Sequence, residues 1–593
     1  MKEHLSIIKR LISDSLKEHK RIIAYFVCFT IGSSTLPALY ALLVNVITAS
    51  LTENGTIFSF GIHIAVFGFI ILACTGAKLF CQFKADTIMT YIRMTFSNRL
   101  NAKMFDIPYS TLEEESFFAK NHQAFTSLNS SEGGVEKICN LIFYFPSNII
   151  ALLLLSLLFV NLSPFAPFLV LIASAGNILL KVKAESFRIN LKTKIARLER
   201  KLEYIFRTTQ NDSNNKELRL YDAKDILELR STEALEDIRK VHKSIRRYDF
   251  KINSFFYIFY LLIMLLFYFT IVEQFRNGLL SIAHVLMYTT ALVQILLITE
   301  NIASDSRSFI SEHRNVAELF DFLYEQKPDS SETKMQDAAE AHGQAVQAVI
   351  KIEGLSFRYP NSAENTLKNI NIKINKGEKI AIVGLNGAGK STLIKCLTGL
   401  YKKYSGTIEL SGVDLQAAPL AWVSVRMGAL HQDVCLYAFS LRENIASASE
   451  GIDEEKVKES LEKIGLSDLL ANSLDSTVFK IMDDQGLEFS GGQKQKVAFS
   501  RLLYKQPEVF ILDEPTSALD SVAEESLLRE IEQAVHSGTC IFVTHRLPSI
   551  KHFDRIVVMH EGLIVEEGEH AELMSLRGQY YKLYTTQQAY YEG

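Results

Sequence analysis

The run from Gly384 to Thr392 has the residue types and spacing needed to bind phosphate. An apolar segment, KIAIV, leads into this run, and STLIKCLTGL at its end has the pattern of a helix. Glycines let backbone N–H groups approach phosphate oxygens, and a helix N-terminus adds a partial positive charge. We expect Lys390 to reach the β- and γ-phosphates of ATP and Ser391 to ligate Mg²⁺. The predicted ATP-binding residues of the run are Gly384, Leu385, Asn386, Gly387, Ala388, Gly389, Lys390, Ser391 and Thr392.

A second apolar segment, VFILDE, ends in two carboxylates. Asp513 is placed to hold Mg²⁺, directly or through water, and to contribute to ATP binding. Glu514 follows it and is placed to orient and polarise the attacking water. An isolated Asp-Glu pair is usually a solvated strand end. The apolar run before this pair and PTSALD after it favour the catalytic interpretation.

The first half of the chain, which precedes these motifs, contains long runs without Asp, Glu, Lys or Arg. Such runs are typical of membrane-spanning helices, which need about 20 apolar residues each. The turn at Asn161 to Pro167 divides the longest run into two spans. The sequence predicts six spans, at about residues 22–48, 56–80, 138–160, 164–182, 252–272 and 279–300.

Lys and Arg are concentrated in the two long connections, roughly 78–137 and 181–251, and are rare in the three short ones. By the positive-inside rule, both termini and the long connections face the cytoplasm. The long connections have helical periodicity, so we expect membrane helices that extend well beyond the bilayer. Residues 1–21 place apolar and basic residues at helical spacing, which predicts an amphipathic helix on the membrane surface.

The remaining sequence gives the expected domain organisation. The polar residues 326–347 fit a flexible linker, and residues 348–593 form a soluble nucleotide-binding domain behind the transmembrane domain of residues 22–325. The formal net charge of -4 argues against a nucleic-acid partner. The seven scattered cysteines form no CxxC pair, which disfavours a metal site or a disulfide framework.

Polar residues in the last predicted span have two interpretations. Thr290, Gln294, Asn301 and Asp305 fall within a narrow arc at helical spacing. They could line a water-filled substrate path, as polar residues inside spans often do. They could equally form hydrogen bonds between helices. Thr290, Gln294 and Asn301 are therefore candidate cavity residues.

The segment FSGGQKQK, Phe489 to Lys496, resembles the signature motif of the ATP-binding cassette (ABC) family. The family combines this motif with the phosphate loop and LDEPTSALD, and it usually has Leu where this chain has Phe489. The resemblance covers the whole chain and implies an exporter-type half-transporter. The implied fold is an α-helical six-span transmembrane domain with long cytoplasmic helix extensions, plus an α/β P-loop nucleotide-binding domain.

The resemblance also implies roles for single residues. Tyr359 would stack on adenine, and His545 would be a catalytic residue that contacts the γ-phosphate. Gln432 would lie between the ATP site and the membrane domain, as a catalytic residue and a ligand of the metal. Asp483 and Asp484 fall where exporters have an acidic contact to the cytoplasmic helices. Two further sets complete the implied site: the signature residues Ser490, Gly491, Gly492 and Gln493, which contact the ATP of the other subunit, and the dimer-interface loop Ser517, Ala518, Leu519 and Asp520.

Because the signature of one subunit closes the ATP site of the other, the resemblance implies a dimer, and intact motifs favour a homodimer. The implied function is ATP-driven export by alternating access, in a bacterial inner membrane, with ATP and Mg²⁺. The segment KELRLYDAKD, residues 216–225, resembles exporters of lantibiotics and other modified peptides, so a peptide or amphipathic cargo is expected. A multidrug or lipid exporter, or an exporter-shaped importer of a metal-chelate, remain alternatives.

Overall fold

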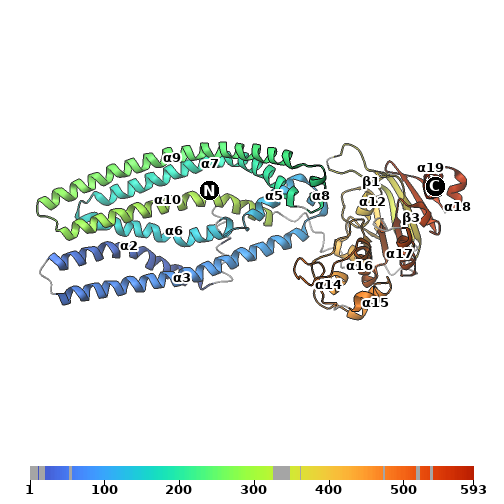
Figure 1. Ribbon diagram of the computed structural model, residues 1–593, viewed down its shortest axis with the longest axis horizontal. Coiled ribbons are helices and arrows are strands. Elements are labelled where there is room, and N and C mark those ends of the chain that lie inside the picture. The colour runs from blue at the N-terminus through green and yellow to red at the C-terminus, as the bar shows by residue number, and fades with distance from the viewer. Residues whose placement is uncertain are drawn as a thin grey trace. The chain divides into compact units, whose positions relative to one another are not determined.

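The structure is a computed structural model of the 593-residue chain (Figure 1). It describes residues 11, 20–52, 57–131, 133–210, 212–324, 348–360, 362–471, 474–515, 521–534 and 538–592. The chain forms two compact units, the first of residues 1–107 and 114–326 and the second of residues 108–113 and 327–593. The predicted linker, the dimer-interface loop 517–520 and most of the predicted surface helix 1–21 lie outside the described residues.

The first unit is built from helices. Within the described residues, six of them are long and apolar enough to cross a membrane. This confirms the six-helix part of the predicted fold class. The six are α2 (Ile22–Thr52), α3 (Ile57–Asp106), α6 (Gly134–Leu157), α7 (Ala166–Gln210), α9 (Lys224–Arg276) and α10 (Ile282–Tyr324). Shorter elements are α5 (Glu115–Thr126), η1 (Leu158–Asn161) and α8 (Asp212–Leu220).

Helix α10 forms the centre of this unit and packs on α2, α6 and α7. Its buried residues Tyr288, Leu292 and Ile295 recur at intervals of three or four, so they share one face of the helix. The Tyr288 ring lies 5.2 Å from that of Phe159, and the Tyr260 hydroxyl donates a hydrogen bond to the Leu292 carbonyl at 2.8 Å. Close packing and hydrogen bonds of this kind hold membrane helices together where lipid removes the hydrophobic driving force.

Charged residues buried between these helices are paired with one another. The Arg93 Nε of α3 lies 2.6 Å from the Glu136 Oε2 of α6. Lys181 Nζ of α7 contacts Glu300 Oε1 of α10 at 3.1 Å and Asn253 Oδ1 of α9 at 2.7 Å. A buried charge without a partner is costly, so these pairs fix which helices lie side by side.

Four of the long helices continue well past their apolar stretches, as their bounds show. The polar parts of α7 and α9 pack on each other through Leu198, Val241 and Ile245. Near the apolar boundary, the rings of Phe187 and Tyr248 stack with centroids 4.4 Å apart, and Arg188 forms an ion pair with Asp249. The two helices therefore form one antiparallel pair over their polar and apolar parts.

The second unit contains two sheets. The first is antiparallel, with strand order β2 (Leu367–Asn375), β1 (Ala348–Phe357), β4 (Ser405–Leu410), β5 (Val413–Asp414). The second is parallel except at its β10 edge, with order β10 (Leu563–Gly568), β9 (Arg555–His560), β3 (Lys379–Val383), β8 (Thr539–Val543), β7 (Val509–Asp513), β6 (Met427–Leu430). These sheets confirm the α/β part of the predicted fold class.

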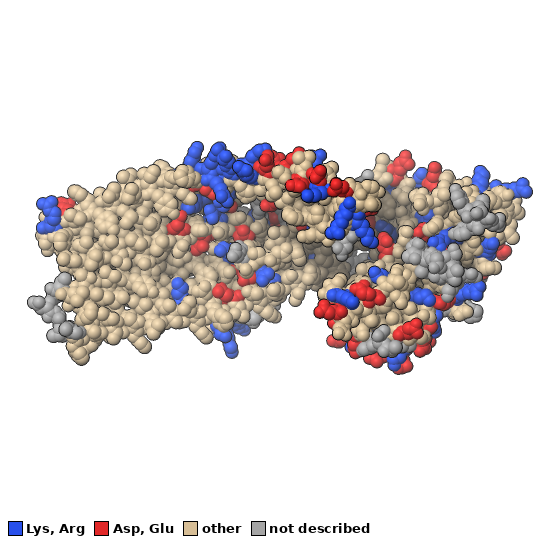
Figure 2. Space-filling view, in the orientation of Figure 1, with Lys and Arg blue, Asp and Glu red and all other residues tan. Residues whose placement is uncertain are grey.

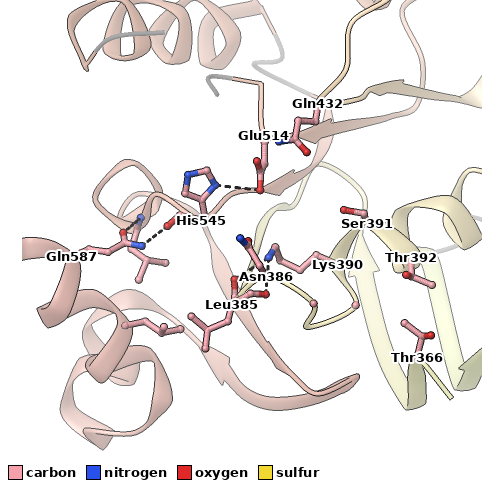
Figure 3. Close-up of a pocket in the computed structure, with 15 residues that line it drawn as sticks. Thr366, Leu385, Asn386, Lys390, Ser391, Thr392, Gln432, Glu514, His545 and Gln587 are labelled. Atoms are coloured by element: carbon pink, nitrogen blue, oxygen red, sulfur yellow. Dashed lines mark hydrogen bonds and ion pairs between the residues drawn. The ribbon is translucent and has the colours of Figure 1, made fainter. Parts of the chain in front are cut away.

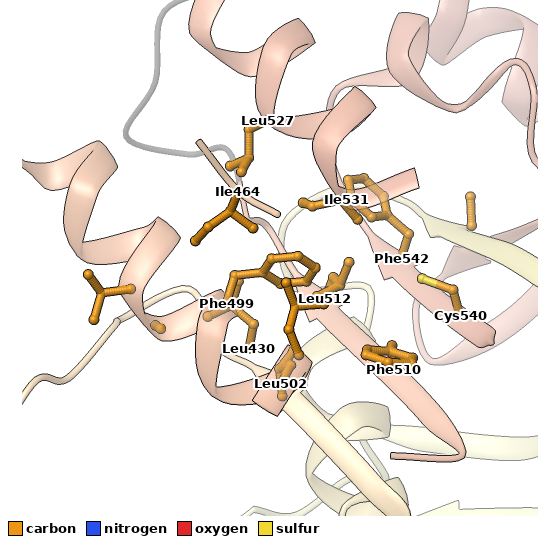
Figure 4. Close-up of a cluster of buried hydrophobic side chains, with 14 of the residues drawn as sticks. Leu430, Ile464, Phe499, Leu502, Phe510, Leu512, Leu527, Ile531, Cys540 and Phe542 are labelled. Carbon is orange, nitrogen blue, oxygen red and sulfur yellow. The ribbon is translucent and has the colours of Figure 1, made fainter. Parts of the chain in front are cut away.

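The helices of this unit cover the second sheet, whose parallel strands are largely buried on both faces. In β7, Val509 and Ile511 enter one hydrophobic cluster, and Phe510 and Leu512 enter the other, since side chains alternate along a strand. Figure 4 shows the second cluster, where Phe499 of α16 (Gly491–Lys505) packs beside Leu512. The helices and turns are α4 (Tyr109–Leu112), α12 (Lys390–Leu397), α13 (Leu420–Arg426), α14 (Leu441–Ala446), α15 (Glu454–Glu462), η3 (Ser467–Ala471), α16 (Gly491–Lys505), α17 (Ser521–Ala534), η4 (Leu547–Ile550), α18 (His570–Leu576) and α19 (Gln579–Glu592).

Candidate functional site

The phosphate loop joins β3 to α12, as its sequence predicts. Gly389 is the N-cap of α12 and has a φ of 101°, in the left-handed region that favours glycine. A Cβ at this position would lie 2.9 Å from the Leu367 Cδ2 and 3.3 Å from the Thr366 carbonyl oxygen. The loop can therefore keep this path only with glycine at position 389.

Lys390 is the first residue of α12 and is buried. Its Nζ donates hydrogen bonds to the carbonyls of Gly384 at 2.9 Å and Leu385 at 3.1 Å (Figure 3). Burial lowers the pKa of the Lys390 ammonium, and the carboxylates of Glu514 and Asp513 partly oppose this effect. A phosphate group entering the loop would give this desolvated cation a much stronger partner than two neutral carbonyls.

The loop opens on a cavity of about 870 Å³. Its lining brings together the phosphate loop with Gln432, Glu514 and His545, which the sequence analysis had selected from distant segments. Ala388, also predicted to bind ATP, is instead buried in the core. The lining residues are Thr366, Gly384, Leu385, Asn386, Gly387, Gly389, Lys390, Ser391, Thr392, Gln432, Glu514, His545, Leu547, Leu583 and Gln587.

Glu514 and His545 face each other in this cavity (Figure 3). They follow the neighbouring parallel strands β7 and β8, whose carboxyl ends meet at the same sheet edge. The Glu514 Oε1 lies 3.2 Å from the His545 Nδ1. Glu514 also has a φ of 51°, which is unusual for a residue other than glycine, and its N–H donates to the Val543 carbonyl at 2.9 Å. Strain of this kind is typical of functional positions, where neighbours hold the backbone in place.

Asp513, at the end of β7, is buried close to Glu514 and Lys390. Burial and the charge of Glu514 raise its pKa to about 6, against the opposing effect of Lys390. A divalent cation would relieve this uncompensated charge. Ser391 and Gln432 line the adjoining cavity, and together the three side chains offer the oxygen ligands that Mg²⁺ prefers. The residues present therefore fit a magnesium ion carried with ATP.

Tyr359 lies apart from the lining residues of the cavity, in an aromatic cluster. Its ring meets those of Phe357 and Tyr401 edge-on, with centroids 5.0 and 5.6 Å away. Its hydroxyl is 3.1 Å from the Thr392 Oγ1, so it still borders the helix that follows the phosphate loop. The expected stacking on adenine stays a prediction.

The signature segment forms the N-terminus of α16. Ser490 is the N-cap: its Oγ accepts the Gln493 N–H at 3.3 Å, and the Gln493 Oε1 accepts the Ser490 N–H at 3.0 Å. Phe489 is buried in the core, which explains why an apolar substitute is tolerated there. Ser490, Gly491, Gly492 and Gln493 are absent from the described residues that line the cavity around Lys390. Asp483 and Asp484 precede them on an exposed loop.

Two residues without a predicted role connect segments of this unit that are distant in the sequence. The Gln587 side chain of α19 accepts the Leu547 N–H at 2.9 Å and donates to the His545 carbonyl, so it grips the backbone on both sides of Arg546 (Figure 3). Arg501 of α16 donates to the carbonyls of Asn444 and Cys435, both at 2.7 Å. No motif marks either residue, because each partner lies more than 35 positions away.

A short segment from the first half of the chain, residues 108–113, belongs to the nucleotide-binding unit. Glu113 Oε1 lies 3.0 Å from the Lys395 Nζ of α12, and the Tyr401 hydroxyl donates to the same carboxylate. The Tyr109 ring meets that of Tyr401 edge-on at 5.9 Å. This segment therefore contacts the helix that starts at the phosphate loop.

The candidate cavity residues of the six-helix unit lie on α10. Thr290 and Gln294 are half-buried, and Asn301 is exposed. The Thr290 hydroxyl donates to the Leu286 carbonyl of its own helix at 2.9 Å, and Asp305 accepts a hydrogen bond from Asn148 of α6 at 3.3 Å. The contact of Asp305 joins α10 to α6, as the interhelical interpretation expects, and the lining of a substrate path by Thr290, Gln294 and Asn301 stays a prediction.

A P-loop domain with a signature helix, joined in one chain to six apolar helices, defines an ABC exporter architecture. The family model described as "ABC transporter" matches residues 367–517, and the nucleotide-binding unit belongs to this family. The domain is an ATP-binding domain, and the chain is an integral membrane protein.

The relatives include subtilin transport ATP-binding protein SpaT of Bacillus subtilis, which is 32% identical over 410 residues, 68% of this chain and 65% of that protein. Leukotoxin translocation ATP-binding protein LktB of Mannheimia glucosida is 38% identical over 229 residues, 39% of this chain and 32% of that protein. The alignments thus span less than two thirds of these relatives. The structure of a bacterial Atm1-family ABC exporter with ATP bound superimposes with a TM-score of 0.77 at 20% identity, over 96% of this chain and 98% of that one.

Proposed function

We propose that this protein is an ATP-driven exporter that works as a homodimer by alternating access. The observation that carries the proposal is the separation of two halves of an ATP site within one nucleotide-binding unit. Lys390, Glu514 and His545 share one cavity, whereas the capped N-terminus of α16 with Ser490 is exposed away from its lining. A second copy of the chain can supply that N-terminus to the γ-phosphate.

The geometry supports hydrolysis of ATP in the cavity. Lys390 binds the phosphates, Glu514 orients a water molecule and accepts its proton, and His545 contacts the γ-phosphate beside Glu514. The water oxygen bonds to the γ-phosphorus while the bond to the bridging oxygen breaks, which leaves ADP and phosphate. Magnesium, held by Ser391, Gln432 and Asp513, would neutralise charge on the phosphates.

Closure of the dimer over ATP would drive transport. ATP favours the closed state because both copies contact it there, and loss of the γ-phosphate contacts reopens the dimer. The contacts of Glu113 with Lys395 and Tyr401 give the phosphate-loop helix a direct link to the first cytoplasmic connection. By the positive-inside rule, this unit and both termini lie in the cytoplasm, as in a bacterial inner membrane.

The proposed cargo is a peptide or another amphipathic compound. The resemblance of residues 216–225 to modified-peptide exporters supports it, and it is compatible with relatives named for subtilin transport and leukotoxin translocation. The test is ATP turnover of the purified protein in lipid vesicles, with candidate peptides, lipophilic drugs or metal chelates added. Stimulation by peptides supports this cargo; stimulation by drugs or chelates alone contradicts it.

The dimer is tested with Glu514→Gln, which keeps the shape of the side chain but cannot accept the proton. With ATP and Mg²⁺, this variant should accumulate as a closed dimer whose two nucleotide sites are occupied, detected by distance measurements between labelled nucleotide-binding units. Lys390→Ala, which weakens phosphate binding, is the matched control and should stay open. A Glu514→Gln protein that stays open with bound ATP would contradict the composite site.

A further inference from the structure

The outer face of α9 changes character over a few residues. Ile252 to Val272 contain no charged residue, and many of their side chains are exposed within the chain, among them Ile258, Leu261 and Leu265. In a membrane-spanning helix, such a face is covered by lipid acyl chains. The segment just before it, RKVHKSIRRYDFK, contains six Lys and Arg residues and a single acidic residue.

The cations of this segment share one side of the helix. Arg239, Lys243, Arg246 and Arg247 follow each other at intervals that place them on one face. The opposite face carries Val241 and Ile245, which are buried against α7. All four cations are exposed, and so is Lys251 at the boundary.

These cations have no acidic partners in the described part of the chain. Lys243, Arg246, Arg247 and Lys251 form neither an ion pair nor a side-chain hydrogen bond there. By contrast, Lys240 pairs with Asp237 at 2.9 Å, and the only acid of the segment, Asp249, is held by Arg188 of α7. Figure 2 shows Lys and Arg gathered along the upper edge, where α9 and α7 run, beside a broad area without charge. Crowded like charges repel, so this surface favours an anionic ligand.

The position along the helix identifies the ligand. With a rise of 1.5 Å per residue, Arg246 and Arg247 lie about 8 Å from Ile252, and Lys243 about 13 Å. The polar headgroup layer of a bilayer is about 5 to 8 Å thick, and long basic side chains reach several ångströms further along the surface. The exposed ring of Phe250 lies at the boundary itself. The cations therefore lie at the depth of the lipid phosphates.

We propose that the basic face of α9, formed by Lys243, Arg246, Arg247 and Lys251, binds the headgroups of anionic phospholipids in the adjoining leaflet. Each cation close to a negatively charged membrane strengthens such binding by about fivefold. The positive-inside rule, which predicts the orientation of the chain in the membrane, counts the basic residues of a connection. The proposed lipid site depends instead on how far these residues lie from the apolar boundary. The proposal concerns lipid binding, so it does not depend on turnover or cargo.

The test compares two pairs of adjacent exposed cations in the full chain. Arg246→Gln/Arg247→Gln removes two from the basic face. The control, Arg200→Gln/Lys201→Gln, removes two cations from α7. Lys181 of α7 contacts Asn253, so it lies level with the start of the apolar run of α9. Arg200 lies about 28 Å along α7 from Lys181, which is beyond the range of salt-screened attraction to the membrane surface. Each protein is placed in nanodiscs of mixed phosphatidylcholine and phosphatidylglycerol. Mass spectrometry of the released protein then counts the bound phosphatidylglycerol.

The parent and the Arg200/Lys201 variant should retain phosphatidylglycerol over phosphatidylcholine, and this preference should weaken with added salt. The Arg246/Arg247 variant should bind phosphatidylglycerol about tenfold more weakly or worse. Equal retention by both variants would overturn the proposal, even if the protein hydrolyses ATP normally. The proposal would also be overturned if the Arg246/Arg247 variant, but not the Arg200/Lys201 variant, lost its dimer in pure phosphatidylcholine. The basic face would then bind a second copy of the chain. Unchanged ATP turnover of both variants in pure phosphatidylcholine would show that they remain folded.

Discussion

In the candidate ATP site of the nucleotide-binding unit, buried charges adjoin a cavity, whereas buried charges between the long helices of the six-helix unit face one another. Among the residues that the structure describes, Lys390 donates hydrogen bonds to two carbonyls alone, and Asp513 shares its surroundings with a second carboxylate. Glu136 instead accepts hydrogen bonds from Arg93 at 2.6 Å and Thr90 at 3.0 Å. Incomplete pairing keeps a site ready for a ligand, while complete pairing fixes the positions of helices.

The largest effect should come from the incompletely paired lysine. Lys390→Ala removes the cation that we propose to bind the phosphates, so ATP turnover should fall at least a hundredfold, as when other electrostatic contacts to a reacting group are lost. Phosphate release by the protein in lipid vesicles measures it. Lys403→Ala, an exposed lysine of the same unit, should keep the parent rate. If ATP turnover of Lys390→Ala stayed within tenfold of the parent, the idea that incompletely paired charges at the cavity serve a ligand would be wrong.

The fully paired charges should affect stability instead. Arg93→Met leaves Glu136 buried without its charged partner, which should cost about 3 to 5 kcal/mol. Thermal unfolding of the protein in detergent should show a lower midpoint. Arg93→Met/Glu136→Met removes both charges and should recover much of the loss. A double variant less stable than Arg93→Met would contradict this explanation, because the stability lost would then not come from an unpaired buried carboxylate.

A smaller effect is expected at the contact of α19 with the histidine segment. Gln587→Ala removes two hydrogen bonds to the backbone beside His545. We expect the less well positioned histidine to lose about 1 kcal/mol of transition-state stabilisation, so kcat should fall about fivefold with little change in KM. Thr586→Ala is the matched control, because within the described residues the hydroxyl of Thr586 bonds the Lys582 carbonyl of its own helix and no group of the site. A change in KM alone would instead place Gln587 in ATP binding.

The smallest effect is expected where charges are paired in solvent. Arg207 and Glu203 lie 2.7 Å apart on α7, but their side chains are 75% and 40% exposed. Arg207→Gln should therefore change stability by less than about 0.5 kcal/mol. An unfolding midpoint equal to that of the parent would support the distinction between buried and exposed pairs. A shift as large as that of Arg93→Met would contradict it.

The sequence allowed the fold class to be predicted because its signals are local. Apolar runs identify the long helices, and GLNGAGKST between a strand and a helix identifies the phosphate loop. The contact of Glu514 with His545 was not predicted, because the two residues follow separate strands and only the family resemblance linked His545 to the γ-phosphate. The pairing of Lys181 with Glu300, 119 positions apart, left no pattern in the sequence. The contacts of Gln587 with the backbone of Leu547 and His545 were also not predictable, because a single glutamine in a helix does not indicate its distant partners.

The left-handed backbone at Glu514 implies that substitutions which stabilise the fold at this position would lower activity. Glutamate tolerates a φ of 51° poorly, at a cost of about 1 to 2 kcal/mol, whereas asparagine adopts it more readily. Asparagine there would shorten the side chain and remove the carboxylate that we propose as the proton acceptor. Random variants selected only for resistance to heat should therefore accumulate asparagine or glycine at this position and lose activity, while selection for growth that depends on the protein should restore glutamate.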